Sequence, residues 1–303
     1  MKKISEPIVF FGSGPVAAES LRSIQENFIV GAVITKPLPP HHHGQAPVEK
    51  LARDLSLKIY YARDKNELQD LFHDDSVLAN IRLGILVDFG IIVSQAVIDR
   101  FKLGIVNSHF SLLPEWRGAD PITFAILSGQ STTGVSLMLI VKAMDEGPLL
   151  AQEQLSLSST VTTPELTSKL IRLSNNMILS YLPLYMLGKL HPIKQNESIA
   201  PTYSRKLTKE DGKINWNKGA KQLEREIRAF KGWPRSHATI NGIEATLTEA
   251  HVIKSSGTPS QAEIINKELV VHCAIDSLVI DHLKPAGKTE MSGPEFLRGH
   301  PIK

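Results

Sequence analysis

The sequence has 303 residues, enough for two domains of ordinary size. Its 42% hydrophobic and 21% charged residues are ordinary globular values, which excludes a disordered or fibrous chain. The formal net charge is +3, but residues 189–303 are the basic part, with 18 Lys and Arg against 13 Asp and Glu. Such an excess permits contact with a phosphate backbone without establishing it.

The apolar segments and the single cysteine exclude a membrane-spanning or disulfide-bonded protein. The longest apolar runs, such as Gly134–Val141, are much shorter than the ~20 residues that span a bilayer. The first residues lack the apolar core of a signal peptide, so we expect a cytoplasmic protein. Cys273 lies in an apolar run and is expected to be a buried strand residue rather than a nucleophile.

The first part of the chain alternates short apolar runs with longer amphipathic segments. This alternation predicts an α/β fold with a doubly wound, mostly parallel sheet, whose ligands bind beyond the carboxyl ends of the strands. The expected strands are Ile8–Phe11, Phe28–Thr35, Lys58–Ala62, Leu83–Val87, Gly104–Asn107, Gly134–Val141 and Leu149–Leu157. The expected helices are Val16–Gln25, Val48–Leu55, Lys65–Asp70 and a long helix within Thr163–Leu187.

Two motifs in this part resemble cofactor-binding or metal-binding sites, and neither is complete. The turn Gly12-Ser13-Gly14-Pro15 has the spacing of a dinucleotide fingerprint, but Pro15 removes a backbone donor and no acidic residue ends the next strand. We interpret it as a tight turn that lets a substrate approach closely. His41-His42-His43 are adjacent and have no partner cluster at metal-ligand spacing, so no metal is predicted.

The composition changes at residue 189 to a polar segment that we interpret as a linker extending to residue 206. The predicted organisation is therefore a first domain at 1–188, the linker at 189–206 and a second domain at 207–303. A helix at Ala220–Phe230 is followed by short alternating runs, which predict a small β-barrel. The expected strands are His237–Ile240, Ala245–Ala250, Glu263–Ile265, Leu269–Ala274 and Ser277–Leu283.

Three polar residues at strand ends are the candidates for chemistry. Asn107 and His109 are two residues apart at the end of an expected strand, so their side chains leave the same face. Asp145 lies in a polar loop after another strand, at the same kind of strand end. Each residue alone is equally consistent with a turn or capping role. Together, a carboxylate, an imidazole and an amide form a complete set for acyl transfer.

Motifs around these residues point to one family. They are Asn107-Ser108-His109, Ser111-Leu112-Leu113-Pro114, Trp116-Arg117-Gly118, Pro121 and Asp145-Glu146-Gly147. The chain thereby resembles the formyltransferases that use 10-formyltetrahydrofolate, which implies a Rossmann-like formyltransferase domain and this folate as the formyl donor. The second part carries further motifs, Tyr203-Ser204-Arg205-Lys206, Ile214-Asn215-Trp216, Gln222-Leu223-Glu224-Arg225, Trp233-Pro234 and Lys284-Pro285-Ala286-Gly287-Lys288. These resemble the members that formylate the initiator methionyl-tRNA, and imply a tRNA-binding β-barrel domain in a monomeric enzyme of translation initiation.

The resemblance also assigns roles to residues. Asn107 and protonated His109 would hold the developing oxyanion, while Asp145 orients His109 and helps to take up the amine proton. The implied folate contacts are the backbone of Asp88, Phe89 and Gly90, and the turn formed by Ser111, Leu112, Leu113 and Pro114. The implied tRNA contacts are Lys36, Arg117, Lys206, Lys209 and Arg228.

One segment departs from the family pattern, and two other functional classes stay open. The family usually carries a longer basic loop that enters the acceptor end of the tRNA, whereas residues 38–44 here are few and mainly Pro and His. An amino-sugar formyltransferase would keep the first domain but bind no RNA. A non-catalytic RNA-binding protein would keep the basic second part and tolerate loss of His109.

Overall fold

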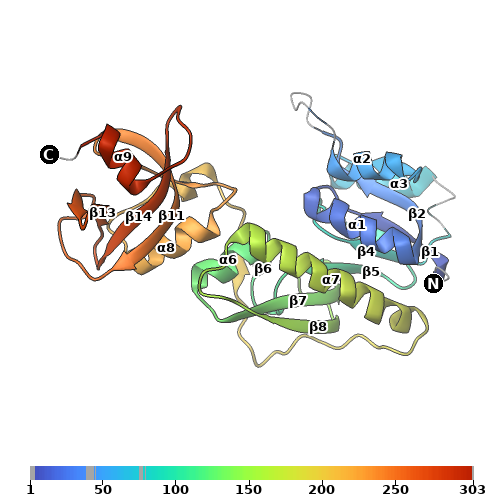
Figure 1. Ribbon diagram of the computed structural model, residues 1–303. Helices are drawn as coiled ribbons and strands as arrows, with labels where there is room; N and C mark the ends of the chain where they lie inside the picture. The colour runs from blue at the N-terminus through green and yellow to red at the C-terminus, as the bar shows by residue number, and fades with distance from the viewer. Residues whose placement is uncertain (1–3, 39–43, 45, 75–77, 79, 302–303) are drawn as a thin grey trace. The chain divides into compact units, whose positions relative to one another are not determined.

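The computed structural model describes residues 4–38, 44, 46–74, 78 and 80–301. The chain forms two compact units (Figure 1). The first contains the residues up to Gly118 together with Thr132–Ser156 and Thr167–Tyr203, and the second contains Ala119–Ser131, Leu157–Leu166 and Ser204–Lys303. Two short segments that lie between parts of the first unit in the sequence, Ala119–Ser131 and Leu157–Leu166, therefore belong to the second unit. The boundaries at 188 and 206 stay a prediction.

The first unit is built on a seven-stranded sheet of order β3-β2-β1-β4-β5-β7-β8. Its strands are β1 (Ile4–Phe11), β2 (Phe28–Thr35), β3 (Ile59–Tyr61), β4 (Leu83–Leu86), β5 (Ile105–His109), β7 (Thr132–Leu139) and β8 (Leu149–Ser156). The strands from β3 to β5 are parallel, and β7 and β8 are antiparallel to their neighbours. The predicted mostly parallel sheet is confirmed.

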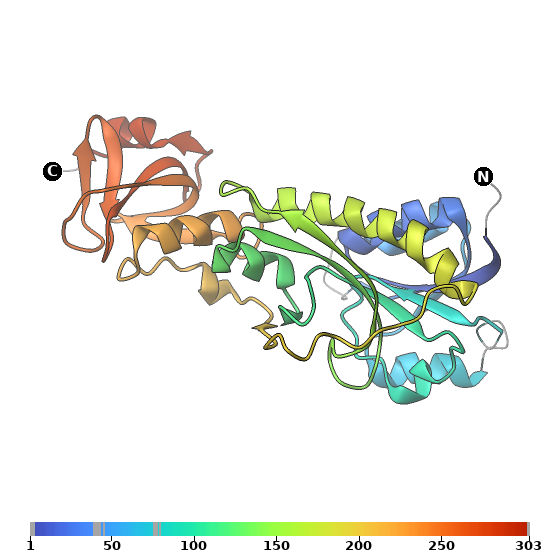
Figure 2. The ribbon, with the colours of Figure 1, turned by 90° about the horizontal axis from the view of Figure 1, so that it is seen from below.

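Helices cover both faces of this sheet, as a doubly wound fold requires. Figure 2 shows the sheet from its side, with the blue α1 and the yellow-green α7 on one face and the cyan helices α3 and α5 on the other. The helices are α1 (Pro15–Asn27), α2 (Pro47–Asp54), α3 (Lys65–Asp74), α5 (Gln95–Ile98) and α7 (Thr163–Met186). Helix α1 begins with Pro15, whose fixed φ suits the first helical position.

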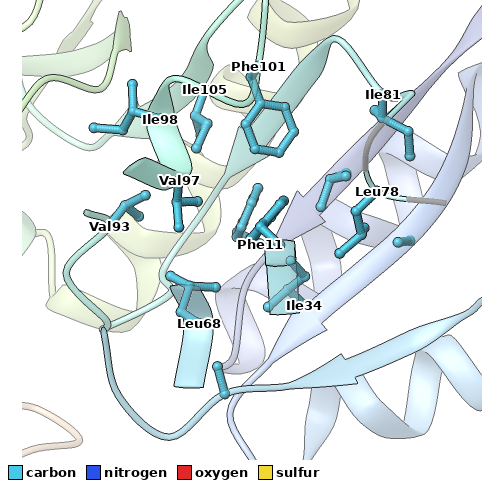
Figure 3. Close-up of a cluster of buried hydrophobic side chains, with 14 of the residues drawn as sticks. Phe11, Ile34, Leu68, Leu78, Ile81, Val93, Val97, Ile98, Phe101 and Ile105 are labelled. Carbon is cyan, nitrogen blue, oxygen red and sulfur yellow. The ribbon is translucent and has the colours of Figure 1, made fainter. Parts of the chain in front are cut away.

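A hydrophobic cluster lies between the sheet and the helices α3 and α5 (Figure 3). The fully buried ring of Phe11, at the carboxyl end of β1, packs against Phe72, Phe89 and Phe101 with centroid distances of 6.4, 5.6 and 5.9 Å. Aromatic pairs at these distances add to the apolar area that they bury. The cluster therefore fixes the ends of β1 and the segment that follows β4.

The second unit contains an antiparallel sheet of order β10-β11-β14-β13-β12, with β15 paired to β14. Its strands are β10 (Ser236–Ile240), β11 (Ile243–Ile253), β12 (Ala262–Ile265), β13 (Glu268–His272), β14 (Ser277–Pro285) and β15 (Met291–Ser292). Its helices are α6 (Pro121–Ser128), the short 3-10 helix η1 (Lys209–Gly212), α8 (Ala220–Ala229) and α9 (Gly293–Gly299). The domain predicted as a small β-barrel after the α/β part is therefore present, as this six-stranded antiparallel sheet with its helices.

Cys273 directly follows β13 instead of lying within it. The side chain is buried, as predicted, and burial raises the pKa of its thiol to about 11. Because the thiolate is the reactive form, this cysteine is inert at neutral pH.

Among the described residues, none of the helices has an apolar stretch of the length that a bilayer requires. No group of three or more His, Cys, Asp or Glu residues in the described part of the chain is placed to hold a metal ion. The run His41–His43 lies outside the described residues.

Candidate active site

Strand β5 carries the first two candidate residues. Asn107 pairs in register with Leu86 of β4 and Met138 of β7, and His109 pairs with Ser136 of β7. Both side chains leave the same face at the carboxyl end of the strand, as the spacing predicts. The amide of Asn107 is partly exposed and makes no side-chain hydrogen bond to another described residue. It is free to donate to a ligand.

His109 is 6% exposed, and both of its ring nitrogens face protein groups. Nε2 lies 2.9 Å from the carbonyl oxygen of Trp116. A carbonyl can only accept, so Nε2 carries a hydrogen. Nδ1 lies 3.8 Å from Oδ2 of Asp145. A proton on Nδ1 would complete an ion pair with this carboxylate.

Asp145 comes from the loop that joins β7 to β8. Its Oδ2 accepts a hydrogen bond of 2.8 Å from the backbone N–H of Gly118. Its own backbone has a φ of 54°, in the left-handed region that non-glycine residues rarely adopt. The side chain of Gln195 donates to the carbonyl oxygens of Asp145 at 2.7 Å and Gly147 at 3.0 Å. The structure thus brings His109 of β5 close to Asp145, and Gly118 and Gln195 hold the loop that carries Asp145.

Arg117 connects this loop to the segment after β5. Its Nη1 donates to Glu146 at 3.0 Å and its Nη2 to the side-chain oxygen of Gln195 at 2.8 Å. Its backbone N–H donates to the carbonyl of Thr202 at 2.9 Å, where the two-residue strands β6 (Arg117–Gly118) and β9 (Tyr203–Ser204) pair. The predicted linker therefore supplies part of the site. Sequence reasoning missed Gln195, since nothing in a polar segment distinguishes a buried glutamine.

The segment after β4, with its implied folate contacts, is held by the turn that follows β1 and by Lys36, which follows β2. Ser13 Oγ donates to the carbonyl of Phe89 at 3.2 Å, and Lys36 Nζ donates to that of Gly90 at 3.4 Å. A Cβ on Gly14 would lie 2.3 Å from Oδ2 of Asp88. This contact within the protein explains the glycine, so the turn Gly12–Pro15 supports residues 88–90.

The turn after β5, Ser111–Pro114, is also held by contacts within the protein. The side chains of Ser111, Leu113 and Pro114 are buried, and Leu112 is partly exposed. Gln152 Nε2 donates to the carbonyl of Leu113 at 2.8 Å. With Phe89 also buried, most of the implied folate contacts can touch a ligand only through their backbone.

The residues implied for tRNA binding differ in whether their charged side chains already form ion pairs within the protein. In the second unit, the ammonium groups of Lys206 and Lys209 form no ion pair with a described residue. The Arg228 guanidinium instead pairs with Glu224 and donates to the carbonyl of Val161 at 2.8 Å.

A cavity of about 750 Å³ in the second unit is lined by four cationic side chains, Lys209, Lys213, Arg235 and Lys284.

The chain is similar to known proteins over both of its parts. Residues 7–182 match the formyl transferase family and residues 206–301 match the formyl transferase C-terminal domain. The methionyl-tRNA formyltransferase of Pseudoalteromonas translucida is 32% identical, over 96% of this chain and 93% of that protein. The enzyme of the same name from Methylococcus capsulatus is 33% identical, over 97% of both chains.

Solved structures show the same fold. An N-formyltransferase from Helicobacter canadensis, in complex with folinic acid and dTDP-3-aminofucose, aligns with a TM-score of 0.67 over 93% of this chain and 100% of that chain, at 18% identity. HypX from Aquifex aeolicus, in complex with tetrahydrofolic acid, aligns with a TM-score of 0.64 over 96% of this chain and 46% of that chain, at 15% identity. The chain belongs to the formyl transferase family and, within it, to the methionyl-tRNA formyltransferases.

Proposed function

We propose that this chain transfers the formyl group of 10-formyltetrahydrofolate to the amino group of methionine on the initiator methionyl-tRNA. The observation that carries the proposal is the His109–Asp145 pair beside the free amide of Asn107, in a chain related over nearly its full length to methionyl-tRNA formyltransferases. The neighbours that act on amino sugars share only the fold at this level of identity, so they favour no second function.

The reaction needs an oxyanion donor and a route for one proton. The amine nitrogen attacks the formyl carbon, the bond between that carbon and the folate nitrogen breaks, and one proton moves from the amine to that nitrogen. The formyl oxygen carries negative charge as the new bond forms. Asn107 donates its side-chain N–H to this oxygen, because its amide is not engaged by a described residue.

His109 and Asp145 stabilise the negative charge of the formyl oxygen and take up the proton of the amine. With Nε2 held by the Trp116 carbonyl, a proton on Nδ1 makes the ring a cation that faces Asp145 and shares a strand face with Asn107. This cation stabilises the oxyanion electrostatically in a site where solvent access is low. The carboxylate keeps the ring oriented and accepts the amine proton, directly or through water.

We place the pterin of the donor against the backbone of residues 88–90. The carbonyls of Phe89 and Gly90 already accept hydrogen bonds from Ser13 and Lys36. Their backbone N–H groups donate to no described residue, which leaves these donors for a heteroaromatic ring. Leu112 is the partly exposed side chain of the turn after β5 and supplies an apolar contact.

We place the tRNA backbone on the cationic cavity of the second unit. Lys209, Lys213, Arg235 and Lys284 line it, and none of the four side chains forms an ion pair with a residue that the structure describes. Unpaired cations attract phosphate and gain from released counterions. Lys206, three residues before Lys209 in the sequence, is a further candidate contact. Contacts of Lys36, Arg117 and Arg228 with tRNA stay predictions, since these side chains also hold protein groups.

We further propose a monomer that acts in the cytoplasm. The decisive assay combines the purified chain, initiator tRNA charged with methionine, and folate labelled in its formyl group. We expect labelled formylmethionine on the tRNA, and far less product when the acceptor is a dTDP-linked amino sugar. Formylation of the sugar without formylation of the tRNA would contradict the proposal.

A further inference from the structure

Gln195 lies in the polar segment between the two family domains, yet it is only 8% exposed. Its Nε2 donates to two carbonyls of the β7–β8 loop, at 2.7 Å to Asp145 and at 3.0 Å to Gly147. Its Oε1 accepts a hydrogen bond of 2.8 Å from Arg117. These three bonds use both N–H groups and the oxygen of the amide.

The loop that Gln195 holds has little freedom elsewhere. Asp145 has a φ of 54°, a conformation that costs free energy and persists only when neighbouring groups enforce it. A Cβ on Gly147 would lie 1.7 Å from the carbonyl oxygen of Leu139, so the chain returns directly against β7. Gln195 fixes the carbonyls on both sides of Glu146, whose side chain is held by Arg117.

The position of the Asp145 carboxylate depends on this backbone. Its Oδ2 accepts from Gly118 and lies 3.8 Å from Nδ1 of His109, a distance at which a small displacement makes or breaks a direct hydrogen bond. Catalytic groups that move by about 1 Å can lose about 100-fold in rate. A residue that sets the loop therefore sets the pairing of His109 with Asp145.

We propose that Gln195 is a positioning residue, which places the Asp145 carboxylate against His109 by holding the backbone on both sides of the loop. The inference rests on the proposed function and adds a residue of the interdomain segment to its machinery. Gln195 touches neither substrate in this scheme. Its effect passes through Asp145.

Two substitutions separate the bonds that Gln195 makes. Gln195→Met keeps the length of the side chain and removes all three hydrogen bonds. Gln195→Glu keeps the acceptor for Arg117 and removes the two donors to the loop carbonyls. Gln222→Met is the matched control, because Gln222 lies in α8 of the second unit and its side chain hydrogen bonds only Glu226 among the described residues. All chains are assayed as full-length protein, well below their melting temperatures.

We expect both Gln195 variants to lower kcat by ~10-fold to ~100-fold with KM for tRNA and folate within about threefold of wild type. In a chain that already carries Asp145→Asn, Gln195→Met should have almost no further effect, because both changes remove the same pairing. The control should behave as wild type. Full kcat in both Gln195 variants, or an undiminished effect in the Asp145→Asn chain, would overturn the inference.

A second readout does not depend on activity. The ring nitrogens of histidine, labelled with ¹⁵N and assigned through His109→Ala, report the partner of Nδ1. We expect Gln195→Met to shift the His109 signals in the direction that Asp145→Asn does. Unshifted signals would refute the positioning role. An inactive wild-type chain would overturn the proposed function, and this NMR comparison would still decide the role of Gln195.

Discussion

Asn107 and His109 leave the same face of β5, but the protein engages them differently. His109 is held by the carbonyl of Trp116 and faces Asp145, while Asn107 keeps its amide for a ligand. In the mechanism that we propose, the pair of His109 and Asp145 provides the charge, and Asn107 donates a hydrogen bond to the formyl oxygen. Removing any one of the three side chains should therefore raise the activation free energy of the reaction more than it lowers the free energy of unfolding.

We expect Asn107→Ala, His109→Ala and Asp145→Ala each to lower kcat by ~100-fold or more, the usual scale for an oxyanion donor or an acid–base group. The measurement is initial-rate formylation with a melting temperature for each variant. Asn217→Ala, at an exposed position of the second unit, is the control and should keep wild-type turnover. Wild-type kcat in two of the three variants would remove the assignment.

At the scale of elements, the short helix η1 is held by one carboxylate. Asp211 accepts hydrogen bonds from the backbone N–H of Thr208 at 2.7 Å and from its hydroxyl at 3.0 Å, and it pairs with both terminal nitrogens of Arg205. The hydrogen bond to Arg205 is the main cause that lowers the pKa of Asp211 far below its usual range. The group is a local source of pH-dependent stability.

Because the folded state lowers this pKa, Asp211 stabilises the fold at pH values above the unfolded pKa of ~3.9, and the contribution fades as the pH falls below it. We expect Asp211→Asn to lower the free energy of unfolding by roughly 1–2 kcal/mol at pH 7, a value reduced for the exposure of Arg205. Urea unfolding at pH 7 and pH 3 should show a smaller difference between the chains at pH 3. An equal difference at both would contradict this.

The sequence predicted the larger elements and missed those that exist only through pairing. The expected strand Gly104–Asn107 is observed as β5 over Ile105–His109, which extends to His109 because this residue pairs with Ser136 of β7. The strands β6 and β9 have two residues each and no recognisable pattern. They form because Arg117 meets Thr202 across 85 residues of chain, and such a meeting leaves no local signal.

At the scale of the whole molecule, part of the basic excess of residues 189–303 lines one cavity. The four cations that line the cavity of the second unit are far apart in the sequence: Lys209 begins η1, Lys213 follows it, Arg235 precedes β10 and Lys284 lies in β14. Since each neutralised phosphate releases counterions, affinity for tRNA should fall steeply with salt. Binding at the folate site that we propose in the first unit should show no such dependence.

Replacing Lys209, Lys213, Arg235 and Lys284 with Gln should therefore weaken tRNA binding and reduce the salt slope by about 0.9 for each phosphate that is no longer neutralised. Binding titrations at several salt concentrations, with a folate analogue in parallel, measure both. Gln at Lys254 and Lys267, which lie outside the cavity lining, is the control. An unchanged slope in the fourfold variant would refute the placement of the tRNA.

The sequence by itself determined the alternation of strands and helices, the shared face of Asn107 and His109, and the family. Side-chain direction in a strand follows a period of two, so two residues suffice to fix that face. Only the tertiary structure decided that Gln195 and Arg117 hold the loop of Asp145, and that Arg228 is paired while Lys209 is not paired with any described residue. Those facts depend on where distant segments return, because a hydrogen bond is set by distance and angle, not by composition.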